Sequence, residues 1–92
     1  MNLEEIKQFL RIDWEEEDTL LSTLQLAAEE YLSNAGVRKN YSKALYKLAI
    51  QLLISNWYEN RNTVLIGSIS KKIEFSLQSI ITQLVYTQEV IS

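Results

Sequence analysis

The sequence lacks three residue types altogether. Its 92 residues include no cysteine, no histidine and no proline, and only two are glycine. Without cysteine the chain has neither a disulfide framework nor a thiolate nucleophile, and it cannot build a zinc site of the Cys/His kind. A catalytic triad that depends on histidine is also excluded. The acidic run at residues 15–18 could in principle hold a divalent cation or supply paired carboxylates, but consecutive helical residues point in different directions and cannot converge on one ion. The sequence therefore predicts no catalytic, metal-binding or cofactor-binding site.

The charge balance is weakly acidic. The 9 basic and 12 acidic residues give a formal net charge of −3, so no global attraction to nucleic acid or to an anionic membrane is expected, although a local basic patch could still act. A hydrophobic fraction of 47% with 23% charged residues is ordinary for a globular protein, and the length fits one domain over residues 1–92. The amino terminus lacks the basic and apolar regions of a secretory signal, so we expect an intracellular origin.

The stretch from residue 41 to residue 61 is the most apolar part of the chain. Two sets of apolar residues recur there at helical spacing. The first set is Ala44, Leu45, Leu48, Ala49, Leu52 and Leu53, and the second set is Tyr46, Ile50, Ile54 and Trp57. Polar residues occupy only one narrow stripe, which runs from Lys43 to Glu59. The pattern predicts a helix that is apolar over most of its circumference.

Such a helix must be buried by its own domain, by a partner or by lipid. Lipid is disfavoured because Lys43, Lys47 and Asn56 would lie inside the membrane span. We expect part of the apolar surface to pack within the protomer and another part to be available to a neighbour. The candidate protein-interface residues are Tyr46, Ile50, Ile54, Trp57 and Arg61. The structural alternative is that Trp57 belongs to the core and that Arg61 meets the negative end of the helix dipole.

Two helices are expected before this stretch. The first is short, is capped by Asn2 with Glu5 as capping-box partner, and has an apolar face that includes Phe9. The second is expected to have Asp13 as its cap, acidic residues 15–18 in its first turn, and a left-handed stop at Gly36. Joined by a short link, this helix and the central one should pack antiparallel.

The last third of the chain is less regular. Residues 63–66 are β-prone, residues 67–71 are small and polar, and residues 72–75 again favour an extended backbone, so residues 62–75 are predicted to form a long loop or a small hairpin. Helical spacing then resumes from Leu77 to Val85. The fold class is all-α, a small bundle of about four helices.

Basic residues gather in two places. Arg38, Lys39, Lys43 and Lys47 flank the turn before the central helix. A DNA-reading helix-turn-helix is disfavoured there, because the central helix offers only a narrow polar stripe. A solvated face that pairs with Glu29 and Glu30 is the simpler interpretation. Lys71 and Lys72 lie in the predicted serine-bearing loop, where lysines are usually just solvated. If many copies of the chain assembled into a ring, however, a weak contact of these lysines with phosphate would be multiplied.

Three segments together resemble a known family, the small head-to-tail connector proteins of long-tailed bacteriophages and prophages, also called DNA-packaging or head-completion proteins. The segments are LEEIKQFLRID at residues 3–13, DTLLSTLQLAAEEYL at residues 18–32 and KLAIQLLISNWYENR at residues 47–61. The chain departs from the family in its last third. Members of the family have a proline and a glycine before the final helix and an arginine at the carboxyl terminus. This chain has Ile-Glu-Phe-Ser-Leu at residues 73–77, and its tail contains no arginine.

The resemblance implies an all-α structural protein of the virion, without enzymatic activity or cofactor. Such a protein forms a homo-oligomeric ring at the head–tail junction, between the portal protein and the tail or the next head-completion protein. It extends the DNA channel, toward which Lys71 and Lys72 would face, and it would occupy the host cytoplasm during assembly. The alternatives are a small helical adaptor or regulator that binds a partner protein, or a DNA-binding regulator that uses Arg38 to Lys47. No membrane partner is expected.

Overall fold

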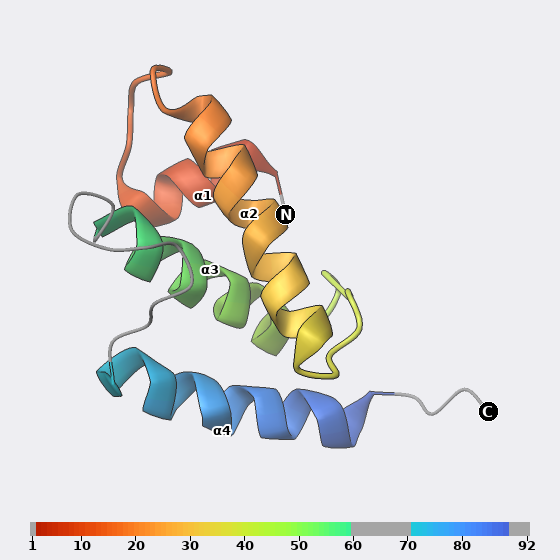
Figure 1. Ribbon diagram of the computed structural model, residues 1–92. Coiled ribbons are helices and arrows are strands. Elements are labelled where there is room, and N and C mark those ends of the chain that lie inside the picture. The colour runs from red at the N-terminus through yellow and green to blue at the C-terminus, as the bar shows by residue number, and fades with distance from the viewer. Residues whose placement is uncertain (1, 60–70, 89–92) are drawn as a thin grey trace.

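The computed structural model describes residues 2–59 and 71–88, except for the side chain of Lys72, and consists there of α-helices with no strand (Figure 1). The helices are α1 (Leu3–Leu10), α2 (Asp18–Asn34), α3 (Ala44–Glu59) and α4 (Lys71–Thr87). The predicted all-α fold class with four helices is confirmed.

Helix α1 begins with the predicted capping box. The backbone N–H of Glu5 donates to Asn2 Oδ1 at 2.9 Å, and the backbone N–H of Asn2 donates to Glu5 Oε1 at 3.4 Å. These bonds satisfy two backbone donors at the helix start. Ile6 is buried, but Phe9, which was expected on the apolar face, remains 43% exposed. The helix ends at Leu10, and the C-cap residue Arg11 adopts the left-handed conformation with φ 60°.

Helix α2 begins at Asp18 rather than directly after Asp13, so the prediction of Asp13 as its cap is wrong. The intervening residues form a turn in which the Asp18 N–H donates to the Glu15 carbonyl at 3.1 Å. Glu17 occupies the cap position but makes no side-chain capping bond. Its Oε1 instead accepts hydrogen bonds from Trp14 Nε1 and from the Tyr58 hydroxyl. Tertiary contacts therefore fix the start of this helix.

Helix α2 ends just before Gly36, as predicted from the sequence. Gly36 has φ +92°, a conformation that costs glycine little because it has no Cβ. The N–H of Val37 donates to the Leu32 carbonyl at 2.9 Å, and the N–H of Gly36 donates to the Ser33 carbonyl at 3.0 Å. This is the hydrogen-bond pattern of the Schellman motif, and the buried side chains of Leu32 and Val37 supply its usual apolar contact.

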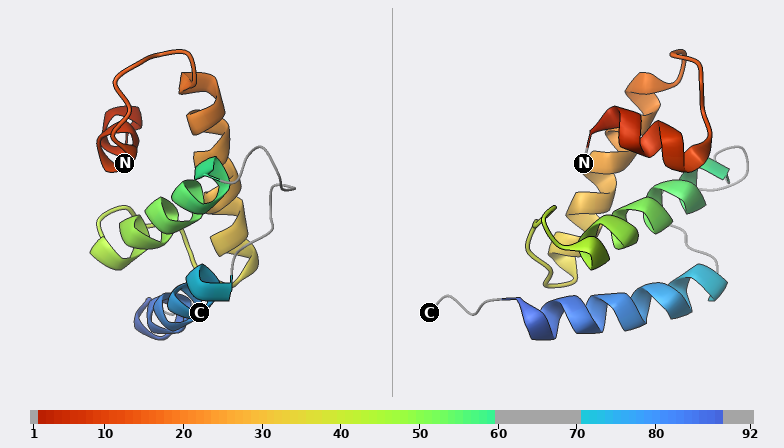
Figure 2. Two further views of the ribbon diagram at one scale, coloured as in Figure 1. Left: turned by 90° about the vertical axis from the view of Figure 1, so that its left-hand side faces the viewer. Right: turned by 180° about the vertical axis from the view of Figure 1, so that it is seen from behind.

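Helix α3 lies in the middle of the molecule, with α1 and α2 on one side and α4 on the other (Figures 1 and 2). It runs back in a direction roughly opposite to that of α2 and crosses it obliquely, in keeping with the expected antiparallel pair. It starts at Ala44, after a turn in which the side chain of Asn40 accepts from the Ser42 N–H at 3.1 Å. The most apolar helix thus occupies the position with most neighbours.

Helix α4 starts at Lys71, so the extended backbone predicted for residues 72–75 is wrong. The rest of the predicted loop, residues 62–70, lies outside the described residues. Ile73 and Leu77 continue the apolar spacing of Ile80 and Leu84 on one helix face. Packing of this face against α3 outweighs the weak β preference of the short segment.

Candidate contact surfaces

The candidate interface residues on α3 are buried within the protomer. Tyr46 is 1% exposed, Ile50 is 0% exposed, Ile54 is 1% exposed and Trp57 is 5% exposed. They offer no surface to a neighbour in this structure, which corrects the expectation drawn from the sequence. Arg61, the fifth candidate, lies outside the described residues.

Three neighbouring helices and two connections provide this cover. The inner faces of α1, α2 and α4 and the connections after α1 and after α2 all join one cluster with α3. Their buried contributors are Ile6, Ile12, Leu21, Leu24, Ala28, Leu32, Val37, Leu77, Ile80, Ile81 and Leu84. Because α3 lies between α2 and α4, both of its flanks are covered. The apolar character of α3 is thus explained by its central place in the fold.

Two buried polar atoms of α3 have no hydrogen-bond partner among the described residues. They are the Tyr46 hydroxyl and Trp57 Nε1. Tyr46 meets the ring of Tyr41 edge-on, with centroids 5.0 Å apart, and Trp57 meets Tyr31 in the same way at 6.3 Å. Burial, with a smaller contribution from Glu29, raises the pKa of Tyr46 to about 12. These two rings therefore serve packing more than polar recognition.

A polar cluster surrounds Glu29 on the flank of α2. The Tyr41 hydroxyl donates to Glu29 Oε2 and accepts from Gln25 Nε2 at 3.0 Å. Lys39 Nζ lies 3.5 Å from Glu29 Oε1, so the predicted pairing of this lysine with Glu29 is present. Burial, opposed by the bond from Gln25 and supported by Glu29, raises the pKa of Tyr41 above its usual value. The cluster ties the connection between α2 and α3 to the side of α2.

The basic residues around the start of α3 do not form one exposed surface. Lys47 Nζ lies 3.4 Å from Glu5 Oε2, and Lys43 Nζ donates to Thr87 Oγ1 at 2.8 Å. With Lys39 paired to Glu29 as well, each of these lysines contacts a different helix. Charges that are spread and partnered in this way do not make a DNA-reading face.

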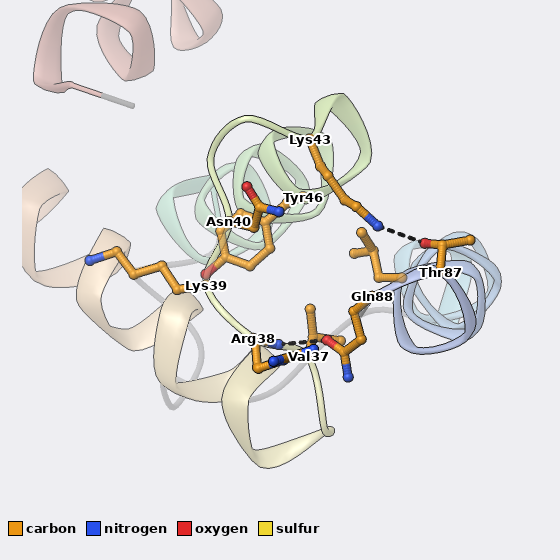
Figure 3. A pocket seen from close by; sticks show the side chains of 9 residues that line it. Val37, Arg38, Lys39, Asn40, Lys43, Tyr46, Thr87 and Gln88 are labelled. Carbon is orange, nitrogen blue, oxygen red and sulfur yellow. Dashed lines mark hydrogen bonds between the residues drawn. The ribbon is translucent and has the colours of Figure 1, made fainter. Parts of the chain in front are cut away.

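A cavity of about 470 Å³ opens where α4 ends against the connection between α2 and α3 (Figure 3). Gln88 holds this junction with both ends of its amide, since its Oε1 accepts from the Arg38 N–H at 3.0 Å and its Nε2 donates to the Gly36 carbonyl at 2.8 Å. Lys43 and Thr87 close another side of the cavity. This junction could not be predicted from the sequence, because it joins residues about fifty positions apart. Its bonds fasten the carboxyl end of α4.

Lys71 is exposed at the first position of α4. Lys72 follows it, and its side chain lies outside the described part of the structure. Lys71 thus lies at the positive end of a helix dipole, where a lysine gains no stabilisation. A groove of about 510 Å³ runs beside it along Glu74, Phe75 and Thr82.

The most exposed aromatic side chains are on the outer face of α4. Phe75 is 81% exposed and Tyr86 is 84% exposed. Apolar periodicity does not reveal this pair, because the most apolar segment of the sequence is the central helix. A signal was nevertheless present: from Phe75 to Gln88 the sequence contains no charged residue, which is unusual for the exposed side of a surface helix.

Two classes of site are not found in the described ranges, residues 2–59 and 71–88. No group of acidic side chains there is arranged to hold a metal ion. None of the helices in those ranges combines the length and the apolar character that crossing a membrane requires.

Comparison with known proteins identifies the family. Residues 1–85 match the family described as "Phage gp6-like head-tail connector protein", so the match covers α1, α2, α3 and nearly all of α4. No curated protein and no solved structure matches the chain. The family match confirms the resemblance seen in the three sequence segments. The chain therefore belongs to the phage gp6-like head-tail connector family, and it is a structural protein of the phage virion.

Proposed function

We propose that this protein forms a ring between the portal protein and the tail, where it extends the DNA channel and completes the phage head. The observation that carries the proposal is the family match over residues 1–85. The protein's partners in this role are further copies of itself, the portal protein, and the tail or the next head-completion protein. Its role is structural, not enzymatic, and it assembles in the host cytoplasm before it becomes part of the virion.

The surface of the protomer supports an assembly role. The hydrophobic core closes within one chain, so the protomer has its own fold before it meets a partner. Exposed aromatic side chains remain on α4. Exposed aromatics gain most from a partner that excludes water around them.

Electron microscopy of purified heads tests this role. We expect heads from the wild type to carry a ring of this protein below the portal, and heads from a deletion strain to lack it and to fail to accept tails. Heads that mature and join tails normally without the protein would overturn the proposal. A ring that lies elsewhere than between portal and tail would overturn it too.

The channel contact is proposed for Lys71 and Lys72. Lys71 is exposed, and a ring would repeat it many times around the DNA, so weak phosphate contacts would add up. We expect the variant Lys71→Glu/Lys72→Glu to assemble but to retain less packaged DNA. The matched control is Arg11→Glu/Arg38→Glu, which reverses two exposed charges outside α4 and should retain DNA normally. Normal DNA retention by the first variant would rule out the channel contact.

A further inference from the structure

The outer face of α4 has the composition of a contact surface between proteins. Phe75, Ser79, Thr82 and Tyr86 follow one another at spacings of four, three and four residues, so they form one stripe along the helix. All four are exposed. The stripe lies opposite the buried face that includes Leu77 and Leu84. Its two aromatic side chains are three turns apart, about 16 Å along the helix, with small side chains between them.

Helix α2 presents a face that complements this stripe. Its outward side carries Thr19, Ser22, Thr23 and Leu26, all of which are exposed. Leu26 is 67% exposed, and the residues that precede it on this face are small. Placing a large side chain of one helix against small side chains of the other is how packed helix faces interdigitate. Leu26 would fit over Ser79 and Thr82, between the two aromatic rings.

The charge pattern favours a second copy of this chain as the occupant. Copies with a net charge of −3 repel one another unless their contact faces are neutral. From Phe75 to Gln88 and from Thr19 to Ala28 the sequence has no charged residue. The centres of the two faces are therefore uncharged, and the charges nearest to them, Lys71 and Glu74 beside the α4 groove and Glu30 one turn after Leu26, lie at the rim of the contact.

The arrangement of the helices makes this contact intermolecular. Because α3 lies between α2 and α4 (Figures 1 and 2), the outer faces of α2 and α4 look toward different sides of the protomer and cannot meet within one chain. A contact between two different patches is heterologous, and its repetition closes a ring when the rotation between copies permits.

We propose that the α4 stripe of one subunit, Phe75, Ser79, Thr82 and Tyr86, packs on the outer α2 face of the next subunit around Leu26. The contact rests on the proposed ring, of which it supplies the subunit interface. The groove beside Phe75, Ser79 and Thr82 receives the Leu26 side chain. The stripe is uncharged and ends in large rings, so burial of the aromatic surface provides the stabilisation of the contact.

Disulfide cross-linking tests the contact directly, because the chain has no cysteine of its own. The proposed contact places Leu26 over Ser79, so these two positions should come within reach of a disulfide. The double variant Ser79→Cys/Leu26→Cys, oxidised in assembled heads, should give a ladder of covalent multimers. Each single variant should stay monomeric. The matched control is Ser79→Cys/Leu48→Cys, which uses an exposed leucine of α3 and should give no ladder.

Three results would overturn this contact while leaving the proposed function intact. One is the absence of a ladder from Ser79→Cys/Leu26→Cys in heads that do carry the ring. A second is covalent dimers from Ser79→Cys alone, which would mean that two α4 stripes face each other. A third is a ladder from the Leu48 control. Heads without any ring would instead contradict the proposed function itself.

A second variant avoids any dependence on cross-linking. Phe75→Gln/Tyr86→Gln removes both aromatic rings without adding charge, and it should reduce the fraction of heads with a ring roughly tenfold or more. Circular dichroism should show the helical content of the wild type. The control Phe9→Gln removes an exposed aromatic ring from α1 and should leave ring assembly unchanged. Normal rings with the double variant would contradict the contact.

Discussion

Helices α3 and α4 differ in a way that their sequences alone do not suggest. Helix α3 is apolar almost all round, yet its largest side chains are buried in its own protomer. Helix α4 has an ordinary apolar face, yet it exposes Phe75 and Tyr86 almost completely. The difference follows from position, because α3 has neighbours on two sides and α4 has α3 on one. The most apolar helix is therefore the central one, and the outer helix carries the surface that we propose for a partner.

The largest expected effect is at the centre of α3. Leu53 is 0% exposed, so Leu53→Ala should lower the free energy of unfolding by about 2–5 kcal/mol through lost burial and a cavity. Urea unfolding of the purified protein measures this. Leu48→Ala, at a position 39% exposed on the same helix, is the control and should cost clearly less. Equal losses at the two positions would mean that α3 is not buried as described.

A smaller loss is expected where α4 is fastened. Gln88→Ala removes the two hydrogen bonds to Gly36 and Arg38. We expect it to lower the free energy of unfolding by about 1 kcal/mol and to speed hydrogen exchange in the last turns of α4. Gln83→Ala, at an exposed position of the same helix, should have little effect. If the two variants behave alike, the junction does not hold α4.

Two tyrosines, Tyr41 just before α3 and Tyr46 within it, should respond differently to removal of their hydroxyl groups. Tyr41→Phe loses the bonds to Glu29 and Gln25 and should cost about 1 kcal/mol at neutral pH. Tyr46→Phe should cost almost nothing, since this hydroxyl has no partner among the described residues. Thermal unfolding at pH 7 compares the two variants. A larger loss for Tyr46→Phe than for Tyr41→Phe would contradict the polar contacts described.

The raised pKa of Tyr46 also predicts how the stability of the protein changes at alkaline pH. Its pKa in the folded chain is raised to about 12 from an ordinary value of 10.0, so the folded state favours the neutral phenol. The resulting stability is present below pH 10 and is lost as the pH rises from 10 towards 12. Tyr46→Phe should therefore lose less stability than the wild type across this window. Identical pH profiles for both proteins would show that Tyr46 does not ionise on unfolding.

The smallest expected effect completes the comparison of the two helices. Phe75→Gln changes a side chain that is 81% exposed, so it should alter the stability of the isolated protomer by no more than about 0.5 kcal/mol. The same urea titration as for Leu53→Ala measures it. A loss comparable to that of Leu53→Ala would mean that Phe75 is covered within the protomer, and α4 would then not differ from α3.

Features set by neighbouring residues could be predicted from the sequence. The capping box of Asn2 and Glu5 and the stop at Gly36 are local, and both are found as predicted. The start of α2 was missed because Glu17 is held by Tyr58, far along the chain. Sequence periodicity shows which residues are apolar, and it therefore predicts a contact with a partner on α3. It does not show which helix lies between two others, so the burial of Tyr46 and Trp57 could not be foreseen.

The most direct test of this account is a cryo-electron microscopy map of the connector on purified heads, at a resolution that places side chains. We predict that Phe75 and Tyr86 are covered by α2 of the neighbouring subunit, while Ile50 and Ile54 remain covered by helices of their own chain. A map in which Ile50 and Ile54 cross the subunit boundary and Phe75 and Tyr86 stay in solvent would contradict it.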